Sequence, residues 1–200
     1  MKRFDCLQAV AVSAGEALVV SSAGAVTLEW NALRPSDGNF RVRTLGLCSS
    51  IALGMALGLP HRKVIALDGD GSLLMNLCSL PTIARMNPKN LIHLLFDNEV
   101  YEASGGTATA SHNSDAVMIA KGAGYRHATW VKTTEEFRAE FASAWNRNEL
   151  TLIAAKIEPG QPKGLPPLRL DEIENKYRFM RYLESTEKKN ILHPGFDSKL

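Results

Sequence analysis

Residues 67–106 read LDGDGSLLMNLCSLPTIARMNPKNLIHLLFDNEVYEASGG. This stretch contains the end of one continuous apolar segment, 63–68 (KVIALD), and all of a second, 91–97 (LIHLLFD). The spacing of apolar residues between them predicts a helix over 73–87. Continuous apolar strands separated by helices are typical of a parallel sheet that is covered on both faces. The stretch therefore predicts an α/β fold.

The same alternation extends along the chain on both sides of this stretch. Further strands are predicted at 17–22, 126–131 and 150–157, a turn at 35–40, and further helices at 3–15, 27–33, 45–59, 115–124 and 133–147. Together these elements predict a three-layer sandwich with a mainly parallel central sheet, formed by residues 1–158 as one domain.

The last part of the chain has a different composition. Residues 159–168 (PGQPKGLPPL) hold four of the nine prolines, which predicts an extended linker. Residues 170–189 predict a charged helix with one apolar stripe, formed by Ile173, Tyr177, Met180 and Leu183. Residues 159–200 are thus expected to be a linker, a helix and a tail that packs on the domain or on a partner.

The charge balance excludes one class of function. The 23 basic and 21 acidic residues give a formal net charge of +2. An electrostatic nucleic-acid binder needs clustered Lys and Arg, so no nucleic-acid partner is expected. No run of about 18 apolar residues occurs, so no membrane span is expected either.

The three cysteines indicate a reducing compartment. Cys6, Cys48 and Cys78 are widely spaced and form no CxxC motif, which argues against a disulfide framework and against an iron–sulfur site. Cys48 and Cys78 are interpreted as small buried residues. A cytoplasmic location fits this usage best.

The first candidate site is the turn Gly69-Asp70-Gly71-Ser72, between a strand and a helix. Glycines let a backbone approach a ligand closely, and a helix N-terminus offers free N–H groups to an anion. A carboxylate at such a place repels phosphate unless a hard cation such as Mg²⁺ bridges the two. Asp70 is therefore interpreted as a metal ligand. The alternative is a tight turn in which Asp70 caps the helix.

The second candidate site follows the next strand. Asp97-Asn98-Glu99-Val100-Tyr101 stands where this strand ends, and neighbouring parallel strands end at the same edge of a sheet, where ligands bind. Asn98 can offer a neutral carbonyl oxygen, and the loop after it a backbone carbonyl. The alternative is that Asn98 is an ordinary β-turn residue.

These two segments resemble the motif of the thiamine-diphosphate enzymes, Gly-Asp-Gly followed after about 26 residues by Asn. Here residues 72–97 separate the Gly-Asp-Gly from Asn98, and Asp97 replaces the first Asn of the usual pair. The resemblance implies Mg²⁺ held by the Asp70 carboxylate, the Asn98 side chain and the Val100 carbonyl. It also implies cofactor contacts, which involve Gly69, Gly71, Ser72 and Tyr101.

The resemblance extends toward the N-terminus. Thr44-Leu45-Gly46 resembles the segment under the thiazolium ring, with Leu45 as the apolar wedge that bends the cofactor. Ser22-Ala23-Gly24, with Thr27 after it, resembles a second turn that contacts the diphosphate. Residues 5–158 thus look like one pyrophosphate-binding module. The alternatives are a core role for Leu45 and a simple helix start at Gly24 and Thr27.

Within this family, the local sequence is similar to the branch of the sulfopyruvate and phosphonopyruvate decarboxylases. GDGSLLMNLCSLPTIA and DNEVYEASGG carry this similarity. The branch has Tyr-Gly where this chain has Tyr101-Glu102, so either Glu102 turns outward or the substrate differs.

The resemblance implies a subunit of a larger enzyme. Enzymes of this class need a second, pyrimidine-binding module whose glutamate activates the cofactor, and the roughly 40 residues after 158 are too few for another such domain. A separate pyrimidine-binding α subunit in an α₂β₂ assembly is implied. The apolar helix at 46–59 could belong to that interface or to the core.

The implied activity is decarboxylation of a small anionic 2-oxo acid. The alternatives are a subunit of an acetolactate-type carboligase and a non-catalytic cofactor-binding module. A ferredoxin-dependent oxidoreductase is disfavoured because no cysteine cluster is present. His112 could take part in proton transfer, or could be a solvated loop histidine.

Overall fold

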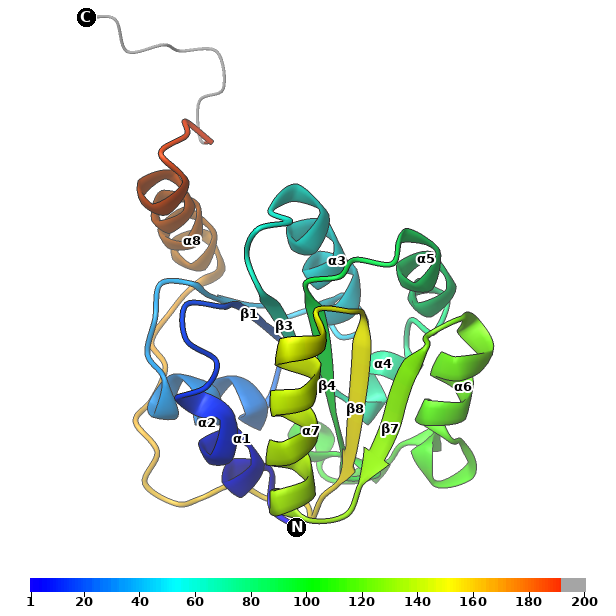
Figure 1. Cartoon of the computed structure of the whole chain (residues 1–200). Helices are drawn as coiled ribbons and strands as arrows, with labels where there is room; N and C mark the ends of the chain where they lie inside the picture. Colours follow the sequence, from blue (N-terminus) through cyan, green and yellow to red (C-terminus); the bar gives the residue numbers. More distant parts are fainter. Residues whose placement is uncertain (192–200) are drawn as a thin grey trace, which may run out of the picture.

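A six-stranded sheet forms the middle layer of the computed structural model, which describes residues 1–191 (Figure 1). The strand order is β2-β1-β3-β4-β8-β7, and all neighbouring strands run parallel. The strands are β1 Leu18–Ser21, β2 Asn39–Arg41, β3 Val64–Gly69, β4 Leu91–Asp97, β7 His127–Val131 and β8 Thr151–Lys156. The predicted α/β class with a mainly parallel central sheet is confirmed.

Helices cover both faces of this sheet (Figure 1). One face packs against α1 Arg3–Ala11, α2 Ala25–Leu33 and α7 Thr134–Arg147. The other face packs against α3 Cys48–Gly58, α5 Ser79–Met86 and α6 Ala116–Ala123, with the short α4 Asp70–Leu74 at its edge. Successive residues of β3 alternate between the two cores: Ile65 faces the first and Ala66 the second. Because both faces are buried, most positions in the central strands β1, β3, β4 and β8 are apolar.

Several element boundaries differ from the prediction; the helix predicted over 3–15, for example, ends at Ala11. The helix predicted over 73–87 is two helices, α4 and α5, and α4 begins at Asp70 itself. Pro81 explains the break, since proline is tolerated in the first turn of α5 but would disrupt a continuous helix. The turn predicted at 35–40 ends earlier, because Asn39 already pairs with β1 as part of β2.

The C-terminal helix α8, Glu172–Glu187, packs beside the edge strand β2, and only the second half of the predicted apolar stripe faces the protein: Leu183 is buried and Met180 half-buried. Ile173 and Tyr177 are 71% and 45% exposed, whereas Asn175, Phe179 and Leu183 are buried. The reason is the free edge of β2, which needs polar partners as well as apolar contact. The Asn175 side chain accepts from the Arg41 N–H at 3.2 Å and donates to the Arg41 carbonyl at 2.9 Å.

Residues 157–171 connect β8 to α8 as an extended segment that is fastened at both ends. Near its start, the N–H of Glu158 donates to the Met1 carbonyl at 2.9 Å. Near its end, the Arg41 guanidinium donates to the Leu170 carbonyl and to Glu172.

All three cysteines are free. Cys48 is buried as predicted, but the prediction for Cys78 is wrong, because this residue lies exposed in the turn between α4 and α5. Within residues 1–191, no helix is both long enough and apolar enough to cross a bilayer.

Candidate cofactor site

The carboxyl ends of β1, β3 and β4 lie at one edge of the sheet and bring the predicted segments together. The N–H of Ser22, after β1, donates to the Leu67 carbonyl of β3 at 2.9 Å. The N–H of Gly46 donates to Ser72 Oγ, in α4, at 3.2 Å. The Gly69–Ser72 turn, the segment around Gly46 and the end of β1 are therefore neighbours.

Asp70 is buried at the start of α4 and is 4% exposed. Its Oδ2 accepts a hydrogen bond from the Thr109 hydroxyl at 2.5 Å. Burial raises the pKa of its carboxyl above the ordinary value, while Thr109 and the backbone N–H groups of Asn98 and Gly71 oppose that shift. The contact with the Asn98 backbone joins the two predicted metal ligands in one place.

Asn98 and Tyr101 lie on the loop that follows β4. Asn98 Oδ1 accepts from the Val100 N–H at 3.2 Å, and Glu99 between them is left-handed with φ 62°. The Tyr101 ring packs directly on Gly71, where a Cβ atom would lie only 2.2 Å from Tyr101 Cε1. Gly71 is therefore required by a close contact within the motif, in addition to any approach of a ligand.

A small hairpin explains how distant residues reach this turn. Strands β5 Val100–Tyr101 and β6 Thr107–Ala108 pair antiparallel, with the 3₁₀ turn η1 Glu102–Ser104 between them. The hairpin returns the chain to the edge of the sheet, where Thr109 meets Asp70.

Asp97 stands where the family motif usually has Asn, and neighbouring groups compensate its negative charge. It is fully buried, and its carboxylate accepts from the Ser111 hydroxyl and, at 3.2 Å, from the Glu99 N–H. Lys156 Nζ at the end of β8 lies 2.8 Å from Asp97 Oδ2 and 2.5 Å from Glu99 Oε1. A lysine from a neighbouring strand thus neutralises the extra carboxylate.

Thr109, Ser111 and Lys156 were missed by sequence reasoning. From this part of the chain, the sequence offers His112 as a candidate, because histidine is the usual proton carrier. The structure places His112 on the surface, with 78% of its side chain exposed and its Nδ1 4.0 Å from Glu99. Thr109 and Ser111, which both precede it, are the buried residues that contact Asp70 and Asp97.

Leu45 and Gly46 stand between β2 and α3. Leu45 is half-buried, and Gly46 is left-handed with φ 89°, which favours glycine. The Gly46 carbonyl accepts from Asn76 Nδ2 at 2.8 Å. The neighbouring side chains Leu47 and Met75 are apolar and 41% and 56% exposed.

Gly24 and Thr27 form the start of α2. Gly24 precedes the helix with φ 116°. The buried Thr27 hydroxyl donates to the Ser22 carbonyl at 2.7 Å and lies 2.9 Å from Ser21 Oγ. The Thr27 hydroxyl is therefore engaged in hydrogen bonds within the turn that joins β1 to α2.

Glu102 turns outward, to residues beyond the predicted site. Its Oε2 lies 3.4 Å from Arg3 Nη2, and its Oε1 accepts from the Gly160 N–H. The first of the two alternatives for the Tyr101-Glu102 departure therefore holds.

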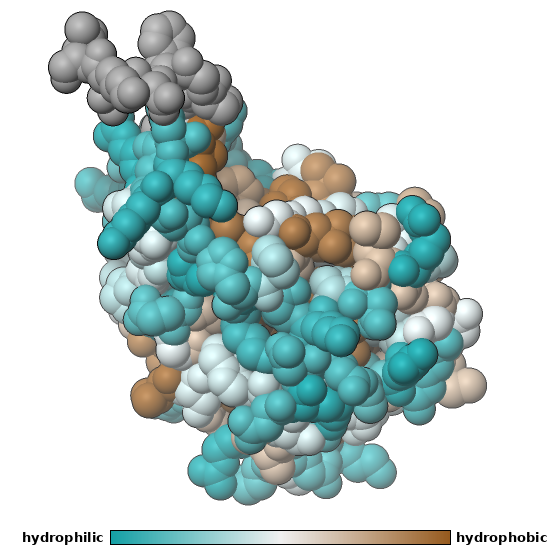
Figure 2. All heavy atoms as spheres, turned by 45° about the horizontal axis from the view of Figure 1, so that its top comes forward, coloured by the Kyte–Doolittle hydropathy of each residue, from teal (hydrophilic) through white to brown (hydrophobic). Residues whose placement is uncertain are grey.

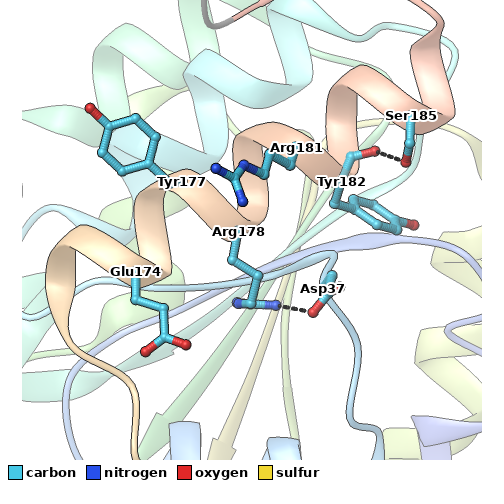
Figure 3. A pocket seen from close by; sticks show the side chains of 7 residues that line it. All are labelled: Asp37, Glu174, Tyr177, Arg178, Arg181, Tyr182 and Ser185. Carbon is cyan, nitrogen blue, oxygen red and sulfur yellow. Dashed lines mark hydrogen bonds and ion pairs between the residues drawn. The ribbon is translucent and has the colours of Figure 1, made fainter.

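Two cavities lie away from the predicted residues. One, of about 630 Å³, runs along α8, where Arg178 donates to Asp37 at 2.9 Å and Tyr177 and Arg181 point outward (Figure 3). The other, of about 290 Å³, lies between the N-terminus of α1 and residues 158–162. Within residues 1–191, no three or more His, Cys, Asp or Glu side chains are grouped to hold a metal ion.

The fold and the sequence of this chain match a known family. Residues 35–155 match the family described as "Thiamine pyrophosphate enzyme, C-terminal TPP binding domain", and the chain belongs to it. The resemblance inferred from the Gly-Asp-Gly motif is confirmed. The crystal structure of benzoylformate decarboxylase from Polynucleobacter necessarius has the same fold, with a TM-score of 0.69 at 21% identity over 84% of this chain and 34% of that one.

Several relatives are considerably more similar to this chain in sequence than this enzyme is. The sulfopyruvate decarboxylase subunit beta of Methanocaldococcus jannaschii is 39% identical over 190 residues, which cover 92% of this chain and 97% of the relative. The phosphonopyruvate decarboxylase of Streptomyces hygroscopicus is 36% identical over 165 residues, 81% of this chain and 41% of the relative. The sulfopyruvate decarboxylase of Methanosarcina acetivorans is 33% identical, with 92% of this chain matched to 48% of the relative.

Proposed function

We propose that this chain is the thiamine-diphosphate- and Mg²⁺-binding β subunit of a heteromeric 2-oxo acid decarboxylase. The observation that carries the proposal is the match to sulfopyruvate decarboxylase subunit beta along nearly the whole of both chains. The substrate is a small anionic 2-oxo acid of the sulfopyruvate or phosphonopyruvate type. A cytoplasmic location is part of the proposal, because the cysteine usage favours a reducing compartment.

The side chains at the edge of the sheet fit the magnesium–diphosphate group. Mg²⁺ prefers oxygen ligands and keeps positions for phosphate oxygens. Asp70 supplies one buried carboxylate, Asn98 an amide oxygen and Val100 a backbone carbonyl, all on neighbouring turns. Asp97 is already compensated by Lys156, so Asp70 is the carboxylate left for the cation. Bound thiamine diphosphate supplies the carbanion chemistry, and this chain holds and orients it.

The lengths of the relatives support the existence of a partner subunit. The chain spans nearly all of a relative named as a subunit, but only 41% and 48% of two longer decarboxylases whose names mention no subunit. A second module of similar size accounts for the difference. We propose that it is a pyrimidine-binding α subunit that supplies the activating glutamate in an α₂β₂ assembly. The exposed Leu47 and Met75 beside Gly46 give such a partner apolar contact at the site.

The test is to capture the chain from its own host and to study the intact complex by native mass spectrometry, with and without Mg²⁺ and thiamine diphosphate. We expect a second chain of similar size and a cofactor mass that depends on Mg²⁺. The captured complex should then release CO₂ from sulfopyruvate or phosphonopyruvate.

The Asp70→Ala variant separates the site from the fold. We expect loss of cofactor from the complex with the unfolding midpoint nearly preserved, because the hydrogen bonds that the Asp70 side chain makes are offset by the cost of burying its charge. Unchanged cofactor affinity would refute the assignment of Asp70. A complex that binds the cofactor and condenses two 2-oxo acids would instead identify a carboligase, and binding without turnover would identify a non-catalytic module.

A further inference from the structure

A cluster of charged residues lies beside the proposed cofactor site and is used by none of its predicted contacts. Arg3, at the start of α1, pairs with Glu29 of α2 through two hydrogen bonds, Nε to Oε2 at 2.9 Å and Nη2 to Oε1 at 3.0 Å. The Nη2 group also donates to Glu102 at 3.4 Å and to the Gly160 carbonyl at 3.2 Å. Glu102 in turn accepts from the Gly160 N–H.

The pair at the centre of this cluster is deeply buried. Arg3 is 6% exposed and Glu29 fully buried. Removing two charges from water costs several kcal/mol, so a buried pair is weak evidence for stability and needs another explanation. Its geometry offers one: Glu29 holds the guanidinium in a fixed orientation, and the second Nη2 hydrogen is shared between Glu102 and the Gly160 carbonyl.

The three parts joined by this cluster are distant in the sequence. Arg3 belongs to the N-terminal helix, Gly160 to the extended segment after β8, and Glu102 directly follows Tyr101. Figure 1 shows the N-terminus and this extended segment together at the carboxyl edge of the sheet. The loop after Asn98 is thus held on two sides: Tyr101 packs on Gly71, and Glu102 is bound to Arg3 and Gly160.

We propose that Arg3 and Glu102 are positioning residues that hold the loop of residues 98–104 in the conformation that receives magnesium thiamine diphosphate. This inference rests on the proposed function. Ligands are held effectively when a second layer of hydrogen bonds fixes the groups that carry them. The Val100 carbonyl and Tyr101 lie immediately before Glu102, so releasing Glu102 frees the segment that carries them.

The experiment compares Glu102→Ala with Glu158→Ala. Glu158 pairs with the Met1 amino group at 3.0 Å in the same corner of the molecule, but it does not contact the loop. Hydrogen–deuterium exchange of the full chain is measured first, without cofactor. We expect amides of residues 99–106 to exchange about tenfold faster in Glu102→Ala, since hydrogen bonds to a charged group are lost, with β3 and β4 unchanged.

Thiamine diphosphate affinity of the captured complex is then measured at saturating Mg²⁺. We expect the Kd to rise about tenfold in Glu102→Ala, to rise less in Glu102→Gln, which keeps an acceptor, and to stay unchanged in Glu158→Ala. Normal exchange of the loop in Glu102→Ala overturns the proposal, whatever the cofactor does. Faster exchange with unchanged affinity shows a purely structural contact and also overturns it.

A wild-type complex that binds no thiamine diphosphate is a different result. It refutes the proposed function and with it the positioning role, while the exchange data still show whether Glu102 fastens the loop.

Discussion

Gly71 is the residue at which the two halves of the cofactor motif touch. A Cβ atom there would lie 2.2 Å from the Tyr101 ring, so Gly71→Ala should push that ring out of place. We expect a loss of about 1–3 kcal/mol in the free energy of unfolding, measured by urea denaturation, and weaker cofactor binding.

Gly69 provides the matched control. It is extended with φ −110°, and the nearest atom to a Cβ there is 4.0 Å away. Gly69→Ala should therefore leave the unfolding free energy unchanged or slightly higher. The double variant Gly71→Ala/Tyr101→Ala should recover part of the loss of Gly71→Ala, because the clash is removed; no recovery would mean that the contact is not its cause.

Lys156 compensates the buried Asp97 carboxylate. Lys156→Ala leaves that charge with only Ser111 and the Glu99 N–H as partners. Because Lys156 is itself half exposed, we expect a moderate loss of about 1–2 kcal/mol on thermal or urea unfolding. Lys132→Ala, at an exposed lysine, should cost almost nothing.

A double-mutant cycle isolates this pair. Asp97→Asn removes the charge that Lys156 neutralises, so Lys156→Ala should cost much less in the Asp97→Asn background. Equal costs in both backgrounds would show that the two charges are not coupled.

The residues of the site differ in how far they could be predicted. Asp70 and Asn98 follow consecutive apolar strands, so their spacing in sequence already fixes their place at one edge of a parallel sheet. Thr109 reaches Asp70 across 39 residues, and Lys156 reaches Asp97 from a strand whose place in the sheet has no local signal. These contacts depend on the path of a hairpin and on strand order, which the residue pattern does not specify.

At the scale of elements, α8 protects the free edge of β2. Asn175 pairs with both backbone groups of Arg41 and is 1% exposed. Asn175→Leu should cost about 2–4 kcal/mol in unfolding free energy, because a buried N–H and a buried carbonyl lose their partners. An exposed strand edge also promotes association, so sedimentation should show aggregates.

Arg181→Ala tests a nearby exposed position of the same helix and should change neither quantity (Figure 3). A leucine at position 175 that leaves stability and solubility intact would show that α8 does not protect β2.

Asp115 caps the N-terminus of α6. Its side chain accepts from the N–H groups of Val117 at 2.9 Å and Met118 at 3.0 Å. The Met118 N–H and then the Trp130 indole hold the pKa of Asp115 below its ordinary value of 3.8. Asp115→Ala should cost about 1 kcal/mol at neutral pH, and Asp115→Asn much less.

The pH dependence of this cost has a definite sign. A carboxyl whose pKa is lower in the folded state stabilises fully above its unfolded pKa and loses that effect as the pH falls through the folded value. The difference in stability between wild type and Asp115→Ala should therefore be constant near neutrality and shrink below about pH 4. A difference that grows toward acid pH would contradict this account.

The elements that the sequence predicted least well are those whose position depends on packing elsewhere. Apolar strands such as 91–97 were predictable because both faces are buried. The stripe expected on α8 was only partly correct: Leu183 is buried and Met180 half-buried, but Ile173 and Tyr177 are exposed. The buried face of α8 includes Asn175, a polar residue that a search for apolar periodicity does not detect.

For the whole molecule, the proposed partner subunit leads to a prediction about the exposed apolar residues of α3. Leu47 and Leu57 stand at opposite ends of α3 with similar exposure, 41% and 42%, and Leu47 lies beside Gly46. Figure 2 shows apolar surface beside α8, on the side where α3 ends. Exposed apolar residues alone therefore do not identify the surface that the proposed partner contacts.

We expect Leu47→Asp to weaken association with the partner subunit about tenfold or more, because a charge is placed in an apolar contact, and to lower cofactor occupancy in parallel. Leu57→Asp, with the same change at the far end of the helix, should keep the cofactor. Native mass spectrometry of the captured complexes measures both. Equal loss of cofactor in both variants would contradict the prediction that the partner contacts α3 near Gly46.

The order of strands also determines when the chain can finish folding during its synthesis. β8 is the last strand to leave the ribosome, yet its place is between β4 and β7. Until about residue 156 is available, β7 has no neighbouring strand, and β4 has an open edge of unpaired backbone groups. Nascent chains and fragments that stop before β8 should therefore depend on chaperones and aggregate readily, although they already contain every residue of the Gly-Asp-Gly motif and Asn98.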